Sequence, residues 1–421
     1  MTALARSGRP LWPAYLATFT FTLGQWASGV AIPLHVQSLG GSLTEAGTIA
    51  AIRFGLGALF SLPFGAVADA WGTRRTLTVA VIGSAAVNLI PISAEATGSI
   101  APLYAWAILS GLTSSLFLPA IGAYVAGSAH EARRGSAFGW LTLGTHTGIA
   151  SGPAVGGLAW QHLGIVPTYL IATVLAVVAL IGPILMRAGV RARIDMRGLP
   201  GMIGSLARDR VVVGCWVAGF GIGLPWGAVS GLFPLFGTSI GLAAGSIGLL
   251  LALQSITNGL SRVPLGRLID RRRVPPVAMA AGCVTYAGIT SLLGLQTGAW
   301  GIAAVFMVGI LALAFTLMMI QVVISERAPA ELRATGLGGY STALSAGLGI
   351  GPFVAGAVAQ SGGFGIGYAS VAGIGALVAV IAAFLLVGSS RVARGSVGNR
   401  TIRGKEQLDQ PIGVDELDIG R

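Results

Sequence analysis

Charged residues, and acidic ones above all, are scarce in this chain. Of 421 residues only 10% are charged, and 14 Asp and Glu stand against 26 Lys and Arg. A soluble domain carries charge on about a quarter of its residues, so this composition does not fit one. With 54% hydrophobic residues and a mean hydropathy of +0.81, the chain is predicted to lie in a bilayer.

Cysteines and enzyme motifs are also scarce. The two cysteines, Cys215 and Cys283, fall in apolar stretches, so neither a disulfide framework nor a cysteine-rich metal site is expected. The sequence contains no P-loop, no GxSxG elbow, no HExxH helix and no pair of carboxylates deep in an apolar stretch. We therefore expect neither an enzyme nor an ATP-driven pump, and no cofactor or metal.

Apolar stretches long enough to cross about 30 Å of hydrocarbon recur along the chain. Twelve can be drawn, at 11–36, 44–68, 76–94, 99–127, 135–160, 166–187, 211–237, 243–269, 276–296, 299–325, 334–359 and 365–388. The fold predicted is an all-α membrane protein with twelve transmembrane helices in two six-helix bundles, 1–190 and 211–388. Residues 191–210 would form a cytoplasmic linker, and the polar, glycine-rich tail 389–421 is predicted to be disordered.

A duplication relates the two predicted bundles. The run 148–157 returns 199 positions later at 347–356, and its proline stays in step. Gly65 and Asp69 have counterparts 201 positions later, which requires only a two-residue insertion. Such a repeat in an apolar chain is typical of transporters built from two pseudo-symmetric parallel halves, with a binding site between them.

Basic residues gather at one set of span ends. They precede the first span, follow every second span, join the halves and continue into the tail, and the predicted outer loops contain none. Cytoplasmic loops carry such an excess, so the chain is predicted to span a bacterial inner membrane with both termini on the cytoplasmic side. Because the charge is spread over every inner loop, lipid headgroups are the expected partner and nucleic acid is not.

Two arginines, Arg53 and Arg262, lie inside predicted spans, where an unpaired arginine costs at least about 2.5 to 3.5 kcal/mol. Arg53 precedes Gly65 by about 18 Å of helix, which places it near the middle of the bilayer. Adding 201 to its number gives Gln254, so these two residues are predicted to face each other across the pseudo-two-fold axis. For Arg53 the alternative to binding substrate is a bond to backbone carbonyls freed near a glycine.

The span that contains Gln254 carries two more polar residues, Asn258 and Arg262, on the same helix face. We expect these three residues and Arg53 to contact the substrate. For Arg262 the alternative is an ion pair with Asp270 or Glu326 at an inner gate.

The segment 65–75 and its second copy resemble the loop signature of the major facilitator superfamily. The residues that carry the resemblance are Gly65, Asp69, Gly72, Arg74 and Arg75, and then Gly266, Asp270 and Arg271. The resemblance implies that each loop is an inner conformational latch. Ala70 stands where a basic residue is usual, which implies a weaker first latch.

The run 148–157 resembles the helix 5 signature of the superfamily's drug and metabolite antiporters. Its glycines and proline are Gly148, Gly152, Pro153 and Gly156, and Gly351 and Pro352 belong to the second copy. Glycines four apart let helices approach closely, and proline bends a helix where the halves must rock. The resemblance implies efflux by a monomer, whereas the second copy shows that packing alone can preserve the pattern.

Resemblance to the family's cavity-lining helices also implies apolar walls from Trp26, Phe117, Trp226, Phe233 and Phe315, with lipid contact as the alternative.

The resemblance to the family's proton-coupled exporters is incomplete. Ala107 stands where those proteins often carry an arginine, and no Asp or Glu lies deep in a span. His146 is the remaining titratable group in mid-span, which makes it the candidate carrier of a coupling proton. The alternative is a packing residue hydrogen-bonded among Thr142, Thr145 and Thr147.

Together these features predict a secondary active transporter that exports a small drug-like or metabolite compound by rocker-switch alternating access. The alternative is an importer or facilitator of an organic anion, with the carboxylate held by Arg53 and Arg262. A third class, a membrane scaffold that transports nothing, is disfavoured by the latch and kink motifs.

Overall fold

The computed structural model describes residues 11–130, 133–186, 199–272, 274–329 and 332–387, and within these ranges it contains helices and no strand. The first half comprises α1 Trp12–Ser38, α2 Leu43–Trp71, α3 Thr73–Val87, α4 Ile90–Thr97, α5 Ala101–Ser128, α6 Arg134–Leu163, α7 Ile165–Ala179 and α8 Ile181–Leu185. After α9, Leu199–Leu206, the second half comprises α10 Arg210–Ser239, α11 Ala244–Arg272, α12 Ala278–Ser291, the 3-10 helix η3 Leu292–Leu295, α13 Ala299–Arg327 and α14 Arg333–Val387. The predicted disordered tail and most of the predicted linker lie outside the described residues.

Eight helical segments in the described part are long and apolar enough to cross a membrane. Three long helices, α1, α6 and α11, do not reach that level of hydropathy, and α14 counts once over a length of 53 residues. The structure is therefore that of an all-helical, multi-pass membrane protein, while the expected number of twelve spans stays a prediction.

Local chemistry explains where several helices begin and end. α2 begins at a capping box, in which Ser42 Oγ accepts from the Glu45 backbone N–H at 3.1 Å and Glu45 Oε2 accepts from the Ser42 N–H at 2.8 Å. Gly72 ends the same helix with φ of 89°, a backbone conformation that favours glycine. Gly363 breaks α14 in the same way, with φ of 80° and ψ of 167°, so the chain reverses direction there.

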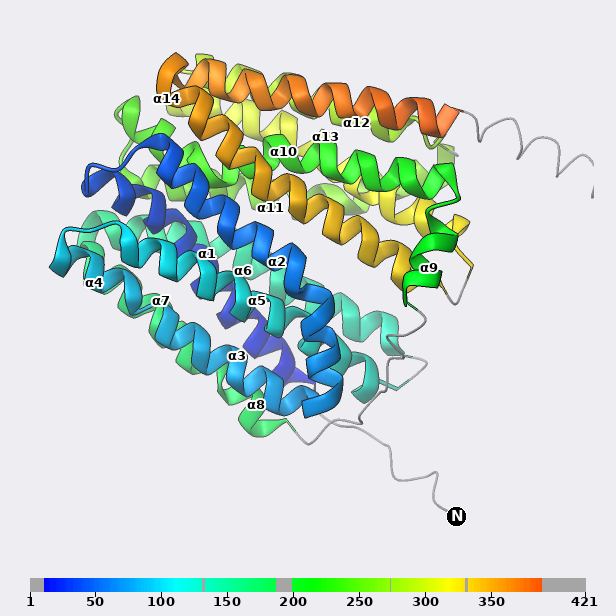
Figure 1. Cartoon of the computed structure of the whole chain (residues 1–421), viewed down its shortest axis with the longest axis horizontal. Helices are drawn as coiled ribbons and strands as arrows, with labels where there is room; N and C mark the ends of the chain where they lie inside the picture. The colour runs from blue at the N-terminus through cyan, green and yellow to red at the C-terminus, as the bar shows by residue number, and fades with distance from the viewer. Residues whose placement is uncertain (1–10, 131–132, 187–198, 273, 330–331, 388–421) are drawn as a thin grey trace, which may run out of the picture.

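The helices form two halves that lie against each other (Figure 1). α10 packs along α14 in one half and α1 packs along α6 in the other, and the halves meet where α2 contacts α14 and α6 contacts α11. We call the end that carries the α1–α2 and α10–α11 loops the closed end, and the end that carries the α2–α3 and α13–α14 loops the open end.

The hydrophobic core differs between these two ends. At the closed end one cluster joins the halves, with Val30 and Ile49 from the first and Phe233 and Leu250 from the second. Toward the open end there are two separate clusters, one made of first-half residues such as Phe117 and one of second-half residues. Because apolar burial holds the halves together at one end only, the molecule has the shape of a V.

Candidate functional site

A cavity lies between the two halves, at mid-length of the helices, with an empty volume of about 970 Å³ counted out to its mouth. Its walls come from α1, α2, α5 and α6 of the first half and from α10, α11 and α13 of the second. The lining contains all five residues expected at a substrate or proton site: Arg53, His146, Gln254, Asn258 and Arg262. It contains no Asp or Glu, so its charged groups within the described residues are cationic.

Arg53 belongs to the first-half wall, and protein groups already bind its guanidinium. One terminal nitrogen donates to the Gln25 carbonyl oxygen at 2.9 Å and lies 3.3 Å from Gln25 Oε1. The charged carbon lies 5.0 Å from the centre of the Trp106 ring and 5.6 Å from that of Phe54, within the range of cation–π attraction. Gly29 makes room for the group, since a β-carbon there would come within 2.8 Å of the other terminal nitrogen.

Gln25 extends this arrangement into a buried polar network. Its Oε1 accepts from Ser110 Oγ at 2.9 Å, and its Nε2 donates to Ser84 Oγ at 3.2 Å. The network ties α1 to α2, α3 and α5, so Arg53 is positioned by four helices of one half. No sequence pattern indicates Gln25 as the partner, because this contact depends on how α1 is rotated against α2.

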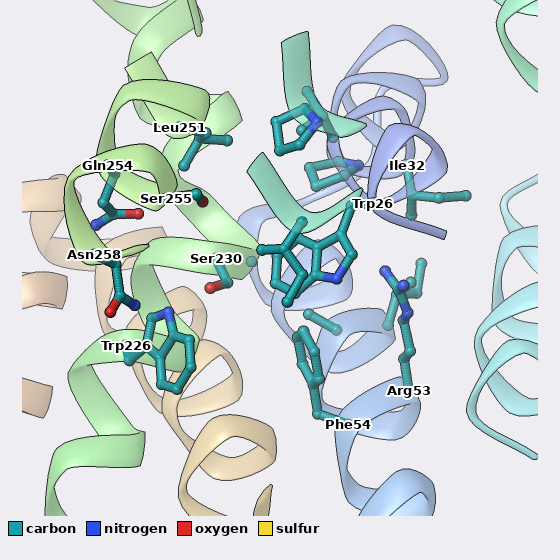
Figure 2. A pocket seen from close by; sticks show the side chains of 18 of the residues that line it. Trp26, Ile32, Arg53, Phe54, Trp226, Ser230, Leu251, Gln254, Ser255 and Asn258 are labelled. Atoms are coloured by element: carbon teal, nitrogen blue, oxygen red, sulfur yellow. The ribbon is translucent and has the colours of Figure 1, made fainter. Parts of the chain in front are cut away.

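The opposite wall is built by α11, where Gln254, Asn258 and Arg262 line the cavity at the predicted spacing of four residues. Figure 2 shows Gln254 and Asn258 across the cavity from Arg53, as the repeat predicted. Asn258 Oδ1 and Arg262 Nε are buried and have no hydrogen-bond partner. Arg262 makes no ion pair with Glu326 among the described residues, while the side chain of Asp270 is not described.

Two of the five aromatic residues expected to line the cavity do so. Trp26 and Trp226 belong to the lining, and Figure 2 shows Trp26 between the two walls. The expectation was wrong for the other three. Phe117 is fully buried and stacks on Phe21 with ring centres 3.9 Å apart, Phe233 is fully buried in the closed-end core, and Phe315 packs in the second-half core. The rings inside a half stabilise the packing of that half. Whether a ring lies in this core or in the cavity depends on the rotation of its helix, which the residue type does not reveal.

Glycines hold the closed end together by direct backbone contact between the halves. A β-carbon on Gly248 of α11 would collide with the Pro153 carbonyl oxygen of α6, and one on Gly47 of α2 with the Pro352 oxygen of α14. At the open end of the same four helices, glycines have nothing within 4 Å of the place where a β-carbon would lie: Gly57, Gly139, Gly259 and Gly338. The cavity is therefore sealed from one end and accessible from the other.

The kink motif packs each half internally. β-carbons on Gly148, Gly152 and Gly156 of α6 would each press on α1, at 2.8 Å from the Phe19 oxygen in the first case. Gly351 in the second copy meets α10 in the same way, through the Leu224 oxygen. The glycines thus serve helix packing in both halves, while the prolines beside them, Pro153 and Pro352, lie where the halves meet.

The predicted latch is described only in part. Gly72 makes the turn from α2 to α3, and the Arg74 guanidinium donates to the Pro183 carbonyl at 2.8 Å and the Ile184 carbonyl at 3.3 Å, both in α8. Arg75 and Arg271 are exposed at the open end. A β-carbon on Gly65 would lie 3.9 Å from Pro119, whereas one on Gly266 would lie 3.2 Å from the end of the Met318 side chain. The side chains of Asp69 and Asp270 are outside the described part.

A histidine that no sequence motif marks lies at the closed end. His35 is fully buried, with Nδ1 3.1 Å from the Tyr169 hydroxyl and Nε2 3.5 Å from Glu95 Oε2, an ion-pair distance without hydrogen-bond alignment. It joins α1 to α4 and α7. No local motif surrounds it, because its partners lie 60 and 134 positions away.

Comparison with known proteins gives the same architecture. A model of the Major Facilitator Superfamily matches residues 14–343. The multidrug resistance protein MdtG of Salmonella paratyphi A is 27% identical over 254 residues, which cover 57% of this chain and 61% of that protein. MdtG of Salmonella typhi is 26% identical over the same shares. The chain thus matches less than two thirds of the length of these curated relatives.

Two solved structures share the fold over nearly all of their length. A bacterial homolog of the human lysosomal transporter Spinster, in an inward-facing and unoccupied conformation, has a TM-score of 0.76 at 12% identity and covers 90% of this chain and 97% of its own. The nucleoside transporter NupG has a TM-score of 0.69 at 16% identity, with 90% and 98% covered. With a family model over most of its length and this shared fold, the chain belongs to the Major Facilitator Superfamily of transporters.

Proposed function

We propose that this chain is a secondary active transporter that exports a small drug-like or metabolite compound across the bacterial inner membrane. Substrate would enter the central cavity from the cytoplasm and leave on the other side after the two halves rock about it. The single observation that carries the proposal is a cavity lined by both halves, which touch at one end only. Clefts between helices that combine mostly apolar walls with a few polar side chains are typical of small-molecule sites.

Twelve spans in two six-helix bundles are the topology that we propose. The three long helices with low hydropathy, α1, α6 and α11, all line the cavity, where polar side chains need not face lipid. Adding them to the eight apolar segments, and counting α14 as two segments separated at Gly363, gives twelve. The even number is consistent with both termini lying on one side.

The distribution of basic residues supports the orientation. Arginines at the helix ends and loops of the open end include Arg74, Arg133, Arg271 and Arg327, whereas the acidic Glu45 lies at the closed end. Because cytoplasmic loops carry the positive excess, the open end is assigned to the cytoplasm. The cavity is then in the inward-facing state, from which an exporter loads its substrate.

Export rather than import is supported by the relatives named for multidrug resistance, at 26 to 27% identity. We assign the cytoplasmic latch to Asp69 and Asp270 with their neighbouring arginines, and the coupling proton to His146, which lines the cavity. His146 lies within electrostatic range of Arg262. Binding of an anion at Arg262 would therefore change the proton affinity of His146, and protonation of His146 would change the affinity of Arg262 for the anion, as coupling requires. The transporter is proposed to act as a monomer.

One observation favours a second candidate, an importer or facilitator of an organic anion. The described lining contains two arginines and no carboxylate, a charge balance that suits an anionic substrate in either direction. Only the direction of movement separates this candidate from the first.

Everted and right-side-out membrane vesicles from one expressing strain test the two candidates together. An exporter accumulates a radiolabelled substrate in everted vesicles when respiration makes the interior acidic, and a protonophore abolishes the accumulation. Accumulation in right-side-out vesicles alone would support the importer. No transport of a broad panel of labelled drugs and organic anions in either orientation would contradict both.

A further inference from the structure

In the described lining, the buried polar atoms that lack a hydrogen-bond partner both belong to one wall. On the first-half wall, Arg53 is already held by Gln25 and by two aromatic rings. On the α11 wall, Asn258 is only 7% exposed and its Oδ1 has no partner, and one turn further along the helix the Nε of Arg262 is also buried and unpaired. Buried polar groups are normally hydrogen-bonded, so these two atoms indicate a missing partner.

We propose that Asn258 and Arg262 form the head-group subsite of the cavity, and that it binds an organic anion with a hydrogen-bond donor beside its charge. This inference rests on the proposed transport function and names the substrate class that the site selects. Arg262 Nε donates to an anionic oxygen, and Asn258 Oδ1 accepts from the neighbouring donor. An acceptor and a donor one helical turn apart match these two groups on one small ligand.

The remaining lining fits the rest of such a ligand. Trp26 and Trp226 supply flat apolar surfaces in the same cavity, so an aromatic or alicyclic body has walls to contact. Arg53 lies on the facing wall without a described carboxylate partner, and its charge adds to the positive potential. Two cations without a counter-charge in the lining oppose a cationic ligand, because juxtaposed like charges in a desolvated site repel strongly.

The proposal gives the two arginines different functions. Arg262 touches the ligand, whereas Arg53 is a positioning residue that ties α1, α2 and α5 together through Gln25. Replacing Arg262 should therefore change ligand affinity, and replacing Arg53 should mainly change the stability of the first half.

Binding of naphthalene probes to the purified full-length protein tests the subsite. The probes are 3-amino-2-naphthoate, 2-naphthoate without the donor, methyl 2-naphthoate without the charge, and the cation 2-naphthylmethylammonium. Dissociation constants are measured by energy transfer from tryptophan. We expect 3-amino-2-naphthoate to bind best and Arg262→Gln to weaken it about 10-fold or more, as for a lost hydrogen bond to a charged group. Asn258→Ala should remove the advantage of the amino group over plain 2-naphthoate.

Two further variants control for folding and for charge. Arg327→Gln makes the same substitution at an exposed ion pair with Asp209, outside the cavity, and should leave all four constants unchanged. Arg53→Gln should keep the preference for the anion. The assignment is wrong if the ester or the cation binds as well as the anion, if no probe binds, or if Arg53→Gln removes the anion preference while Arg262→Gln keeps it.

Transport assays distinguish failure of this subsite from failure of the proposed function. Movement of the cation ethidium through the wild-type chain, without binding of any anionic probe, would overturn the subsite and leave the transporter intact. Binding of the anion through Arg262, without movement of any compound in either vesicle orientation, would support the subsite and contradict transport.

Discussion

Gly248→Ala should open the closed end without unfolding either half. The new β-carbon would collide with the Pro153 carbonyl oxygen on the other half, a contact present only while α6 and α11 touch at that end. Forcing an extra methyl into a packed contact costs about 1 to 3 kcal/mol. Because this cost falls only on the state in which the closed end is packed, it should shift the equilibrium about 5- to 150-fold toward a state in which the halves separate at that end.

Spin labels across the closed end measure that shift. Ser38 at the end of α1 and Ser239 at the end of α10 are both exposed, lie in opposite halves and can be changed to cysteine. The native cysteines, Cys215 and Cys283, are buried and would be replaced by alanine. Pulsed electron resonance should show a longer distance between the labels gaining population in the Gly248→Ala protein.

Gly259→Ala on the same helix is the matched control. A β-carbon there has nothing within 4 Å, and both substitutions bring the same gain in helix propensity, which is equal in the two states. The control should leave the distance distribution as in the wild type. Identical distributions for both variants would show that the glycine contact does not hold the closed end, and the reasoning would fail.

Three further changes concern stability and are measured by thermal melting and by yield after detergent extraction. Gly152→Leu should abolish folding, since even a β-carbon there would lie 2.6 Å from that of Trp26; a folded, active variant would show that α1 and α6 are not tightly packed. Tyr169→Phe should lower stability by about 1 to 3 kcal/mol, because it leaves His35 Nδ1 buried without its partner; an unchanged melting temperature would contradict this. Arg53→Lys should lower stability less than Arg53→Gln, since the ammonium keeps the charge near Trp106 but loses the planar fork; equal losses would exclude the cation–π contribution.

The sequence was sufficient to predict which residues line the cavity where the duplication supplied a second copy to compare. The repeat offset applied to Arg53 predicts Gln254, and the helical period then predicts Asn258 and Arg262 on the same face. The prediction works because a polar side chain in mid-span is costly in lipid and must face protein or water. The α11 wall follows directly from that rule, and the structure places all of these residues in one cavity.

The sequence could not predict the features that depend on helix rotation and on long-range contact. Gln25 binds Arg53 and Ser110 only because α1, α2 and α5 present the faces that carry these three residues to one another. Phe117 and Phe233 are of the residue type expected in cavity walls, yet the rotation of their helices places them inside their own halves, where both are fully buried. The V shape, with one closed and one open end, depends on contacts between the halves, and a single sequence does not show which residues of the two halves meet.

A reversible cross-link at the closed end tests alternating access most directly. Thr238 Oγ1 of α10 donates to Gln37 Oε1 of α1 at 2.9 Å, so cysteines at these two positions lie near enough to be joined across the halves by a short bifunctional reagent with a cleavable disulfide spacer. We predict that the cross-linked protein still binds substrate from the open end but transports none, and that reduction restores transport. Full transport by the cross-linked protein would contradict the account, because substrate would then cross without the halves separating at the closed end.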